Sequence, residues 1–175
     1  MRNVLVAAVL VVLAACANSE GPGMVAPGQG DTSRLDPYEA LIRNEVRSEP
    51  GADWRTIFVL VPICANAGAP AEPKGCDDAF SAEEQTALVQ RLSDLGAPLT
   101  FVTKLDHRTS MRIMTGKERA IVLRLGPLAP QRDGSLHIPA SYTCGGLCGS
   151  GSTHVLELQD GRWVVTGSAG GSWMA

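Results

Sequence analysis

The alternation of apolar and polar residues divides the chain into three parts. Residues 4–13 form an unbroken apolar run, whereas the stretch up to residue 34 consists mainly of Gly, Pro, Ser, Asn, Gln and Asp. Periodic patterns typical of helices and strands begin only at Leu35. Because a polar, Gly-rich stretch cannot bury itself, we expect residues 16–34 to be a flexible tether in front of one folded domain at 35–175.

Two segments show the period of amphipathic helices, and each begins with a capping box. Asp36 and Glu39 form the first box and Ser81 and Glu84 the second, so that their side chains can satisfy free backbone amides at the helix start. The first helix is expected to end near Ser48. The apolar faces are Tyr38, Leu41, Ile42 and Val46 in the first helix and Leu88, Val89, Leu92 and Leu95 in the second. Residues 105–118 fit either a short helix or a loop that crosses the core.

Several segments have the pattern of strands. The near-continuous apolar run Ile57 to Ile63 is typical of a central strand covered on both faces, and Leu99 to Thr103 fits a second short strand. The last third alternates with turn residues at regular spacing and predicts four further strands, at 120–128, 136–143, 154–159 and 162–167.

Turn residues set the expected connections between these last strands. Asp133-Gly134 and Asp160-Gly161 have the composition of two-residue hairpin turns, which need positive φ angles. With the second turn at its expected place, Leu158 lies opposite Trp163 and Leu156 opposite Val165, so that four apolar side chains share one face. The pattern therefore predicts an antiparallel meander.

Together these elements predict an α+β domain, with two N-terminal helices packed on one face of a mainly antiparallel sheet that ends in a four-strand meander. The ending Gly161-Arg162-Trp163-Val164-Val165 resembles the last hairpin of nuclear-transport-factor-2-like and cystatin-like domains. This resemblance covers less than a third of the chain and implies no site residues.

The start of the chain has the properties of an export signal. A basic start, an apolar run and small residues before a cleavage point are typical of a signal peptide, here residues 1–15, and the run is too short to span a membrane, which needs about 20 residues. The sequence Leu13-Ala14-Ala15-Cys16 resembles the lipobox of bacterial lipoproteins. The resemblance implies cleavage before Cys16 and attachment of diacylglycerol and palmitate-type fatty acids to it. The alternative is an ordinary secretory peptide cut near Ala15.

A lipobox implies a membrane as the first partner, through the lipid on Cys16. The exported domain then belongs to the cell envelope, on the cell membrane or, in a Gram-negative cell, on the periplasmic face of the outer membrane. Ala17 is not the aspartate associated with retention in the inner membrane of Gram-negative bacteria, so the resemblance implies the outer membrane in such a cell.

Charge weighs against a polyanionic partner. Without residues 1–15 the chain keeps fourteen basic and eighteen acidic residues, a formal charge of −4, and the sequence shows no cluster of Lys or Arg. Nucleic acids and anionic membrane surfaces are usually bound by a basic face. We therefore expect no nucleic acid partner.

Four cysteines remain in the expected domain, grouped as Cys64 with Cys76 and Cys144 with Cys148. In an oxidising envelope such close pairs are first interpreted as disulfides, and local pairing is favoured among the three possible pairings. The alternative for Cys144 and Cys148 is a redox dithiol or a soft-metal site, with His137 or His154 as a third ligand. We expect two structural disulfides, no metal and no cofactor.

The other polar groups suggest little chemistry. His107, with Asp106, Thr109 and Ser110 nearby, invites a hydrolase interpretation, but adjacent residues on an extended chain point apart, and a solvated polar loop is expected. His137 and His154 are expected on the exposed face of the meander. The glycines of residues 145–151 are expected to form a flexible or tightly turning connection.

The sequence thus favours a non-catalytic envelope lipoprotein, an interaction or accessory module with a possible protein partner. Three alternatives stay open. The first is a metal or thiol handler that uses Cys144 and Cys148, the second a small hydrolase that uses His107, and the third a binder of a small ligand in a cavity under the sheet. The sequence leaves the oligomeric state undetermined.

Overall fold

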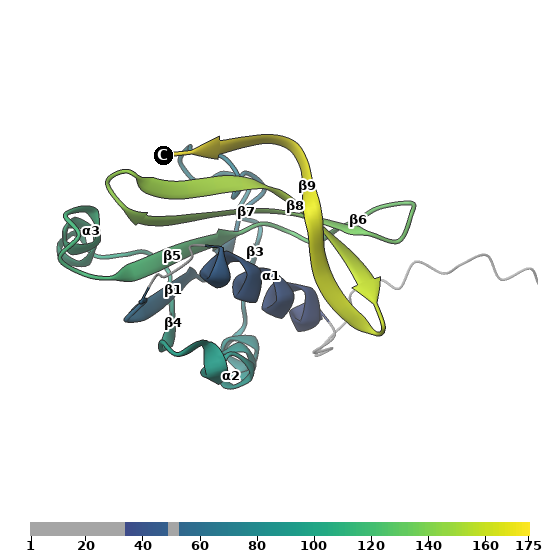
Figure 1. Cartoon of the computed structure of the whole chain (residues 1–175), viewed down its shortest axis with the longest axis horizontal. Helices are drawn as coiled ribbons and strands as arrows, with labels where there is room; N and C mark the ends of the chain where they lie inside the picture. The colour runs from purple at the N-terminus through teal and green to yellow at the C-terminus, as the bar shows by residue number, and fades with distance from the viewer. Residues whose placement is uncertain (1–33, 49–52) are drawn as a thin grey trace, which may run out of the picture.

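The computed structural model describes residues 34–48 and 53–175, and Figure 1 shows their arrangement. The expected signal peptide, Cys16 and the tether up to residue 33 lie outside the described residues. Arg34, the last residue assigned to the tether, is bound to the domain, because its guanidinium donates to Glu84 and, at 2.9 Å, to Asp78. Within the described part of the chain, no helix is long and apolar enough to cross a membrane.

The described residues form three α-helices, one short 3-10 helix and nine strands. In chain order these are α1 (Leu35–Arg47), β1 (Thr56–Leu60), β2 (Pro62–Ile63), β3 (Asp78–Ala79), α2 (Ala82–Arg91), η2 (Ser93–Leu95), β4 (Leu99–Val102), α3 (His107–Met114), β5 (Ala120–Leu125), β6 (Ala129–Pro130), β7 (Leu136–Gly145), β8 (Cys148–Gln159) and β9 (Arg162–Met174). The domain is α+β, as expected.

Seven of the strands form one mixed sheet in the order β4-β1-β5-β7-β8-β9, with β6 paired to β7. β1 lies between β4 and β5 and is parallel to both, whereas the pairs from β5 to β9 are antiparallel. The prediction of a central strand at 57–63 is confirmed by β1 for its first part, whereas Pro62 and Ile63 belong to the separate strand β2. The predicted meander is the run β5-β7-β8-β9, and β2 and β3 pair separately.

The helix α1 buries one face against the sheet. Tyr38, Leu41 and Ile42 are almost fully buried, and the Tyr38 hydroxyl donates to the Gly126 carbonyl at 2.9 Å. The predicted cap was wrong. Asp36 lies inside the first turn, Arg34 occupies the cap position without a side-chain cap, and the Asp36 carboxylate instead accepts a hydrogen bond from Arg91 at 2.6 Å.

The capping box of α2 is confirmed. The Ser81 hydroxyl accepts from the Glu84 amide at 3.2 Å, and the Glu84 carboxylate accepts from the Ser81 amide at 2.8 Å. α2 contacts α1 and β4, and its Leu88 is fully buried.

The ambiguous segment 105–118 contains the helix α3. Its Ile113 is buried in a small cluster with Ala120 and Val122, against which Phe58 and Leu60 of β1 pack. The other side chains of β1, Ile57 and Val59, belong to the main core with α1, so side chains cover β1 on both faces.

The hairpin of β8 and β9 is longer than the sequence suggests. The turn at Asp160-Gly161 is confirmed, with φ of 50° and 75°, and the predicted pairs Leu158 with Trp163 and Leu156 with Val165 are both present. The loop at Asp133-Gly134 is longer than the predicted two residues. Gln131 donates to the Ser135 carbonyl, which leaves three residues between them in the loop.

The connection expected at residues 145–151 is a tight turn at Gly146 and Leu147, and it is shorter than predicted, because β8 begins at Cys148 and includes Gly149 and Gly151. The indole of Trp173 lies directly on these glycines. A Cβ on Gly151 would come 2.6 Å from the Gly68 carbonyl oxygen and would also collide with the indole nitrogen. The absence of side chains here lets the aromatic ring approach the strand.

The loop between β2 and β3 is closed by the disulfide Cys64–Cys76 and lies on the sheet. The Trp173 indole donates to the Gly68 carbonyl at 2.9 Å, and Arg124 donates to the Ala71 carbonyl at 2.9 Å. Side chains of β5 and β9 therefore hold the loop in place from two sides.

Candidate functional site

The strand β9 is the last strand in the order of the sheet and is hydrogen-bonded along one side, to β8. From Trp163 to Met174 its sequence contains no charged residue and no proline. Exposed edge strands usually carry such residues, because open backbone groups pair readily with another chain. From Trp163 onward, β9 therefore lacks the charged residues and prolines that normally keep an edge strand from pairing with another chain.

The edge has a regular first part and a curved second part. The pairing with β8 shifts between Val155 and Leu156 and again near Thr153, and Gly170 has a φ of +76°. Such irregularities bend a strand. The pairing with β8 is regular from Arg162 to Val165, and the backbone from Arg162 to Ala169 contains no positive φ angle. Figure 1 shows β9 curving over the end of the sheet.

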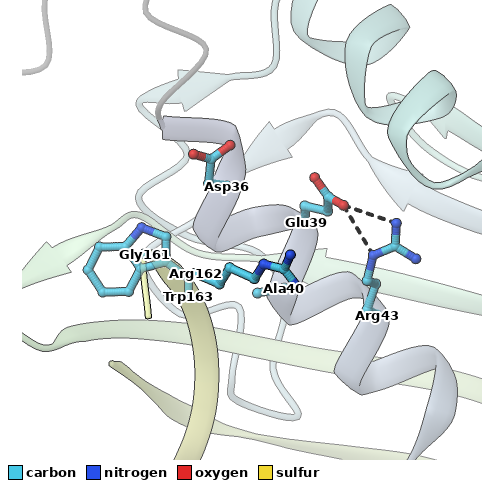
Figure 2. A pocket seen from close by; sticks show the side chains of 7 residues that line it. All are labelled: Asp36, Glu39, Ala40, Arg43, Gly161, Arg162 and Trp163. Carbon is cyan, nitrogen blue, oxygen red and sulfur yellow. Dashed lines mark hydrogen bonds and ion pairs between the residues drawn. The ribbon is translucent and has the colours of Figure 1, made fainter. Parts of the chain in front are cut away.

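A cleft of about 490 Å³ opens beside the beginning of β9. The outer face of α1 provides one wall, with Asp36, Glu39, Ala40 and Arg43, and the start of the strand provides the other, with Gly161, Arg162 and Trp163. Figure 2 shows Arg162 extending toward Ala40 of α1, with the Trp163 indole beside it. An edge strand and a helix thus frame one open groove.

Charges are distributed unequally between the two walls. On the helix, the Arg43 guanidinium donates to Glu39 at 3.0 Å and to Asp94 at 2.7 Å, and this hydrogen bond lowers the pKa of the Asp94 carboxyl. The acidic groups of this wall are therefore already paired with arginines. On the strand, Arg162 forms no ion pair with any residue that the structure describes, so its guanidinium can bind a ligand group.

A second polar group lies in the core, where α1 meets β8. Glu45, only 3% exposed, places Oε1 3.2 Å from Nε2 of His154, and the Ser152 hydroxyl lies 3.3 Å from the same nitrogen. The expectation that His154 faces solvent was wrong, because α1 covers this face of the sheet and leaves the His154 side chain 13% exposed. His137 lies on the opposite face of β7 and is half-buried.

The three side chains do not form a catalytic relay. In a serine hydrolase the hydroxyl and the carboxylate contact different nitrogens of the imidazole, so that the proton passes across the ring. Here both oxygens contact Nε2. Burial raises the pKa of Glu45 to about 7 and lowers the pKa of His154, so the group holds a proton near neutral pH inside the core.

The second cysteine pair is a disulfide that closes the turn between β7 and β8. Cys144 and Cys148 are bonded to each other, with 5.1 Å between their Cα atoms, and Cys64 is likewise bonded to Cys76. This is the local pairing that the sequence favours. In this state neither sulfur is a thiolate donor, and the described residues contain no cluster of three His, Cys, Asp or Glu side chains suited to a metal ion.

The hydrolase hypothesis around His107 finds no support in the geometry. Asp106 is the N-cap of α3, and its carboxylate accepts from the Thr109 amide at 2.9 Å and from the Thr109 hydroxyl at 2.7 Å. The expected polar loop was wrong, since His107 is an exposed residue in the first turn of a helix. Asp106 therefore stabilises the helix start instead of orienting His107.

No protein-family model matches the chain, and the comparisons with characterised proteins and with solved structures found no significant match.

Sequence reasoning missed the groove because it depends on the order of the strands. Residues 162–167 were predicted as a strand, but the pattern does not reveal that this strand is an edge. One available signal was the absence of any charge from residue 163 to 174, which is unusual for an exposed strand.

Proposed function

We propose that this chain is a non-catalytic interaction module of the cell envelope, anchored by lipid on Cys16, whose β9 edge binds an extended segment of a partner protein. In this proposal α1 and α2 form a two-helix layer on one face of the sheet, and α1 supplies the second wall of the binding groove. The observation that carries the proposal is the uncharged, proline-free edge beside the α1–β9 cleft.

Binding by strand addition requires an accessible edge and a source of specificity. Backbone hydrogen bonds along the edge supply affinity, whereas pockets for alternate side chains supply specificity. The part of β9 from Arg162 to Ala169 supplies the edge, and the cleft at its beginning can accept one side chain of the added strand. Arg162 favours an acidic group at that position, because the carboxylates of the facing helix are already paired with arginines.

The cleft also favours a partner protein over a second copy of this chain. If two β9 strands paired antiparallel over residues 162–169, Arg162 and Trp163 of one copy would face Ala169 and Ser168 of the other. These side chains are too small to fill a cleft of about 490 Å³. A different strand with a larger side chain at this position would fill it.

The cleft is less suited to a small ligand. Sites for small molecules are lined mainly by apolar and aromatic side chains, with a few polar groups. Here Trp163 and Ala40 are the apolar residues with side chains, against four charged residues. The groove is better suited to a peptide, which the strand can bind through its backbone.

Site-specific photocrosslinking in intact envelopes tests this proposal. A photoreactive residue is placed at Thr166 on β9 or, as a reference, at the exposed Thr86 on α2. The decisive variant is Val164→Lys, which puts a charge on the edge at a side chain that is already 40% exposed. Its matched control is Gln90→Lys, which adds the same charge to an exposed residue of α2.

We expect a crosslinked product of discrete mass from position 166 that Val164→Lys abolishes and Gln90→Lys leaves unchanged. A product of twice the chain mass would mean that a second copy occupies the edge. Equal products from positions 166 and 86, or a product that survives Val164→Lys, would refute edge binding. Independently, the mass of the N-terminal peptide tests the anchor, because a lipidated Cys16 becomes the first residue and carries acyl chains.

A further inference from the structure

Three exposed apolar side chains gather at the end of the domain where β7 turns into β8. Met111 and Met114 on α3 are 49% and 54% exposed, and Leu147 in the turn is 89% exposed. The last turn of α3 lies against this hairpin, since a Cβ on Gly146 would come 3.3 Å from the Met114 carbonyl oxygen. We call α3 and the turn at residues 144–148 the tip.

The segment that contains α3 and its flanking residues is also rich in basic side chains. Residues 104–119 contain five Lys or Arg and two acidic residues, whereas residues 35–103 contain five and eleven. Two of the five cations are paired, Arg112 with Glu118 at 3.2 Å and Arg119 with Asp53 at 3.4 Å. The other three basic residues, which form no ion pair within the described part of the chain, are Lys104, Arg108 and Lys117. The charge is thus polarised, with a basic tip and an acidic remainder.

We infer that the tip is a membrane-contact surface, in which Leu147, Met111 and Met114 enter the interface of an anionic lipid bilayer while the surrounding Lys and Arg side chains contact its headgroups. Apolar side chains next to cations are the combination by which surface helices bind anionic membranes. The overall formal charge of −4, which by itself weighs against such a surface, conceals this local excess.

The shape of the tip favours a bilayer over a protein partner. Leu147 is 89% exposed at the end of a hairpin and α3 lies beside it, so the apolar groups project and do not line a groove. The cleft between α1 and β9 and the hollow at Asp133 and Glu157 both lie away from the tip. Projecting apolar groups can enter a fluid interface without a complementary surface, whereas a protein partner would have to enclose them.

The disulfide Cys144–Cys148 holds part of this surface in a fixed conformation before binding. The two cysteines are only four residues apart in the sequence, so their disulfide restricts the backbone that carries Leu147. A turn that is already ordered loses little further entropy when its side chain is buried, which favours binding. This gives the second disulfide a role at the surface in addition to bracing the hairpin.

The tip and the start of α1 lie at opposite ends of β8. Asp36 and Glu39 line the cleft next to Gly161, in the turn that follows β8, whereas Cys148, the first residue of β8, belongs to the tip. Twelve residues of strand span roughly 36–40 Å. If the proposed anchor on Cys16 holds one end and the tip holds the other, the domain lies along the membrane. Tip binding itself does not depend on the anchor.

Hydrogen exchange on the full exported chain tests the inference. The chain is equilibrated with vesicles of phosphatidylcholine alone or of equal parts phosphatidylcholine and phosphatidylglycerol, and amide exchange is followed at residues 107–114 and 144–148. Residues 82–91 of α2 serve as the internal reference. We expect slower exchange at the tip only with phosphatidylglycerol, and loss of this protection at about 1 M salt, where the Debye length is ~3 Å.

Two variants separate the charges from the apolar groups. The double substitution Arg108→Gln with Lys117→Gln should weaken tip binding about 30-fold, because each cation near an anionic membrane strengthens binding by a factor of about five. Leu147→Ser should weaken it about 10-fold, as expected for one buried leucine. Arg47→Gln with Arg132→Gln removes the same charge from exposed residues away from the tip and should change nothing. All these side chains are exposed, and circular dichroism verifies that each variant is folded.

Equal exchange with both kinds of vesicle, or protection that the Arg108/Lys117 variant retains, would overturn the inference. A tip that stays unprotected on anionic vesicles but becomes protected in envelope extracts would show that a protein binds there, and would overturn the lipid assignment too. Failure here is distinguishable from failure of the proposed edge binding. Val164→Lys alters β9 without touching the tip, and the mass of the Cys16 peptide reports the anchor separately.

Discussion

Replacing Glu45 by glutamine should reverse the sign of the pH dependence of stability. Burial raises the pKa of Glu45 from 4.5 to about 7, and the difference corresponds to about 3 kcal/mol of unfolding free energy. The core accommodates the carboxyl group in its protonated form, because that form carries no charge. Its contribution is fully present below pH 4.5 and is lost as the pH rises through about 7.

His154 acts in the opposite direction, because burial lowers its pKa from 6.5. Between pH 4.5 and 6.5 the unfolded chain carries one proton on the two groups, with Glu45 ionised and His154 charged. In the folded state Glu45 keeps its proton in this range while burial favours the neutral form of His154, so the opposite contributions of the two groups offset each other. Between pH 6.5 and about 7 the unfolded pair has lost its last proton while Glu45 of the folded state still holds one, so the folded state loses about 0.7 kcal/mol of stability before the curve levels off.

In Glu45→Gln only His154 remains to titrate. The variant should therefore be stable above pH 7 and lose stability as the pH falls below 6.5, where the unfolded histidine takes up a proton that the buried one resists. Urea denaturation across this pH range measures both curves. Glu157→Gln, which removes an exposed carboxylate of β8, is the control and should follow the wild type. Parallel curves for wild type and Glu45→Gln would refute the reasoning.

Two further substitutions test contacts described above by thermal or urea denaturation. Gly151→Ala should destabilise the domain by about 1–3 kcal/mol, because the added methyl collides with the Gly68 carbonyl and the Trp173 indole; a stability equal to the wild type would mean that this ring does not lie on β8. Ser81→Ala should cost about 1 kcal/mol through the lost cap of α2, whereas Asp36→Ala, which loses only an exposed pair with Arg91, should cost less than half of that. Equal costs would contradict the cap assignments.

Local signals in the sequence predicted the parts of the fold that depend on neighbouring residues. The Ser81 box and the Asp160-Gly161 turn were both correct, because each is satisfied within a few residues of chain. The central position of β1 also followed from its continuous apolar run.

Features that depend on distant partners could not be predicted in this way. Asp36 has the spacing of a cap but pairs with Arg91, fifty-five residues along the chain. His154 alternates with apolar residues as an exposed side chain would, yet Glu45 of α1 covers it. The strand at Gly149 could not be expected before Trp173 was known to pack on it. Both proposed surfaces depend on the same kind of long-range arrangement.

The two disulfides join cysteines only 12 and 4 residues apart, and the second pair follows the first along the chain. In an unfolded chain the entropic cost of bringing two residues together grows with the logarithm of their separation, so each cysteine meets its native partner more often than one from the other pair. If the chain is exported as proposed and enters an oxidising compartment from its N-terminus, it presents Cys64 and Cys76 before Cys144. The correct covalent pairing can therefore be reached in order of appearance, without reshuffling and before the sheet that it braces has formed.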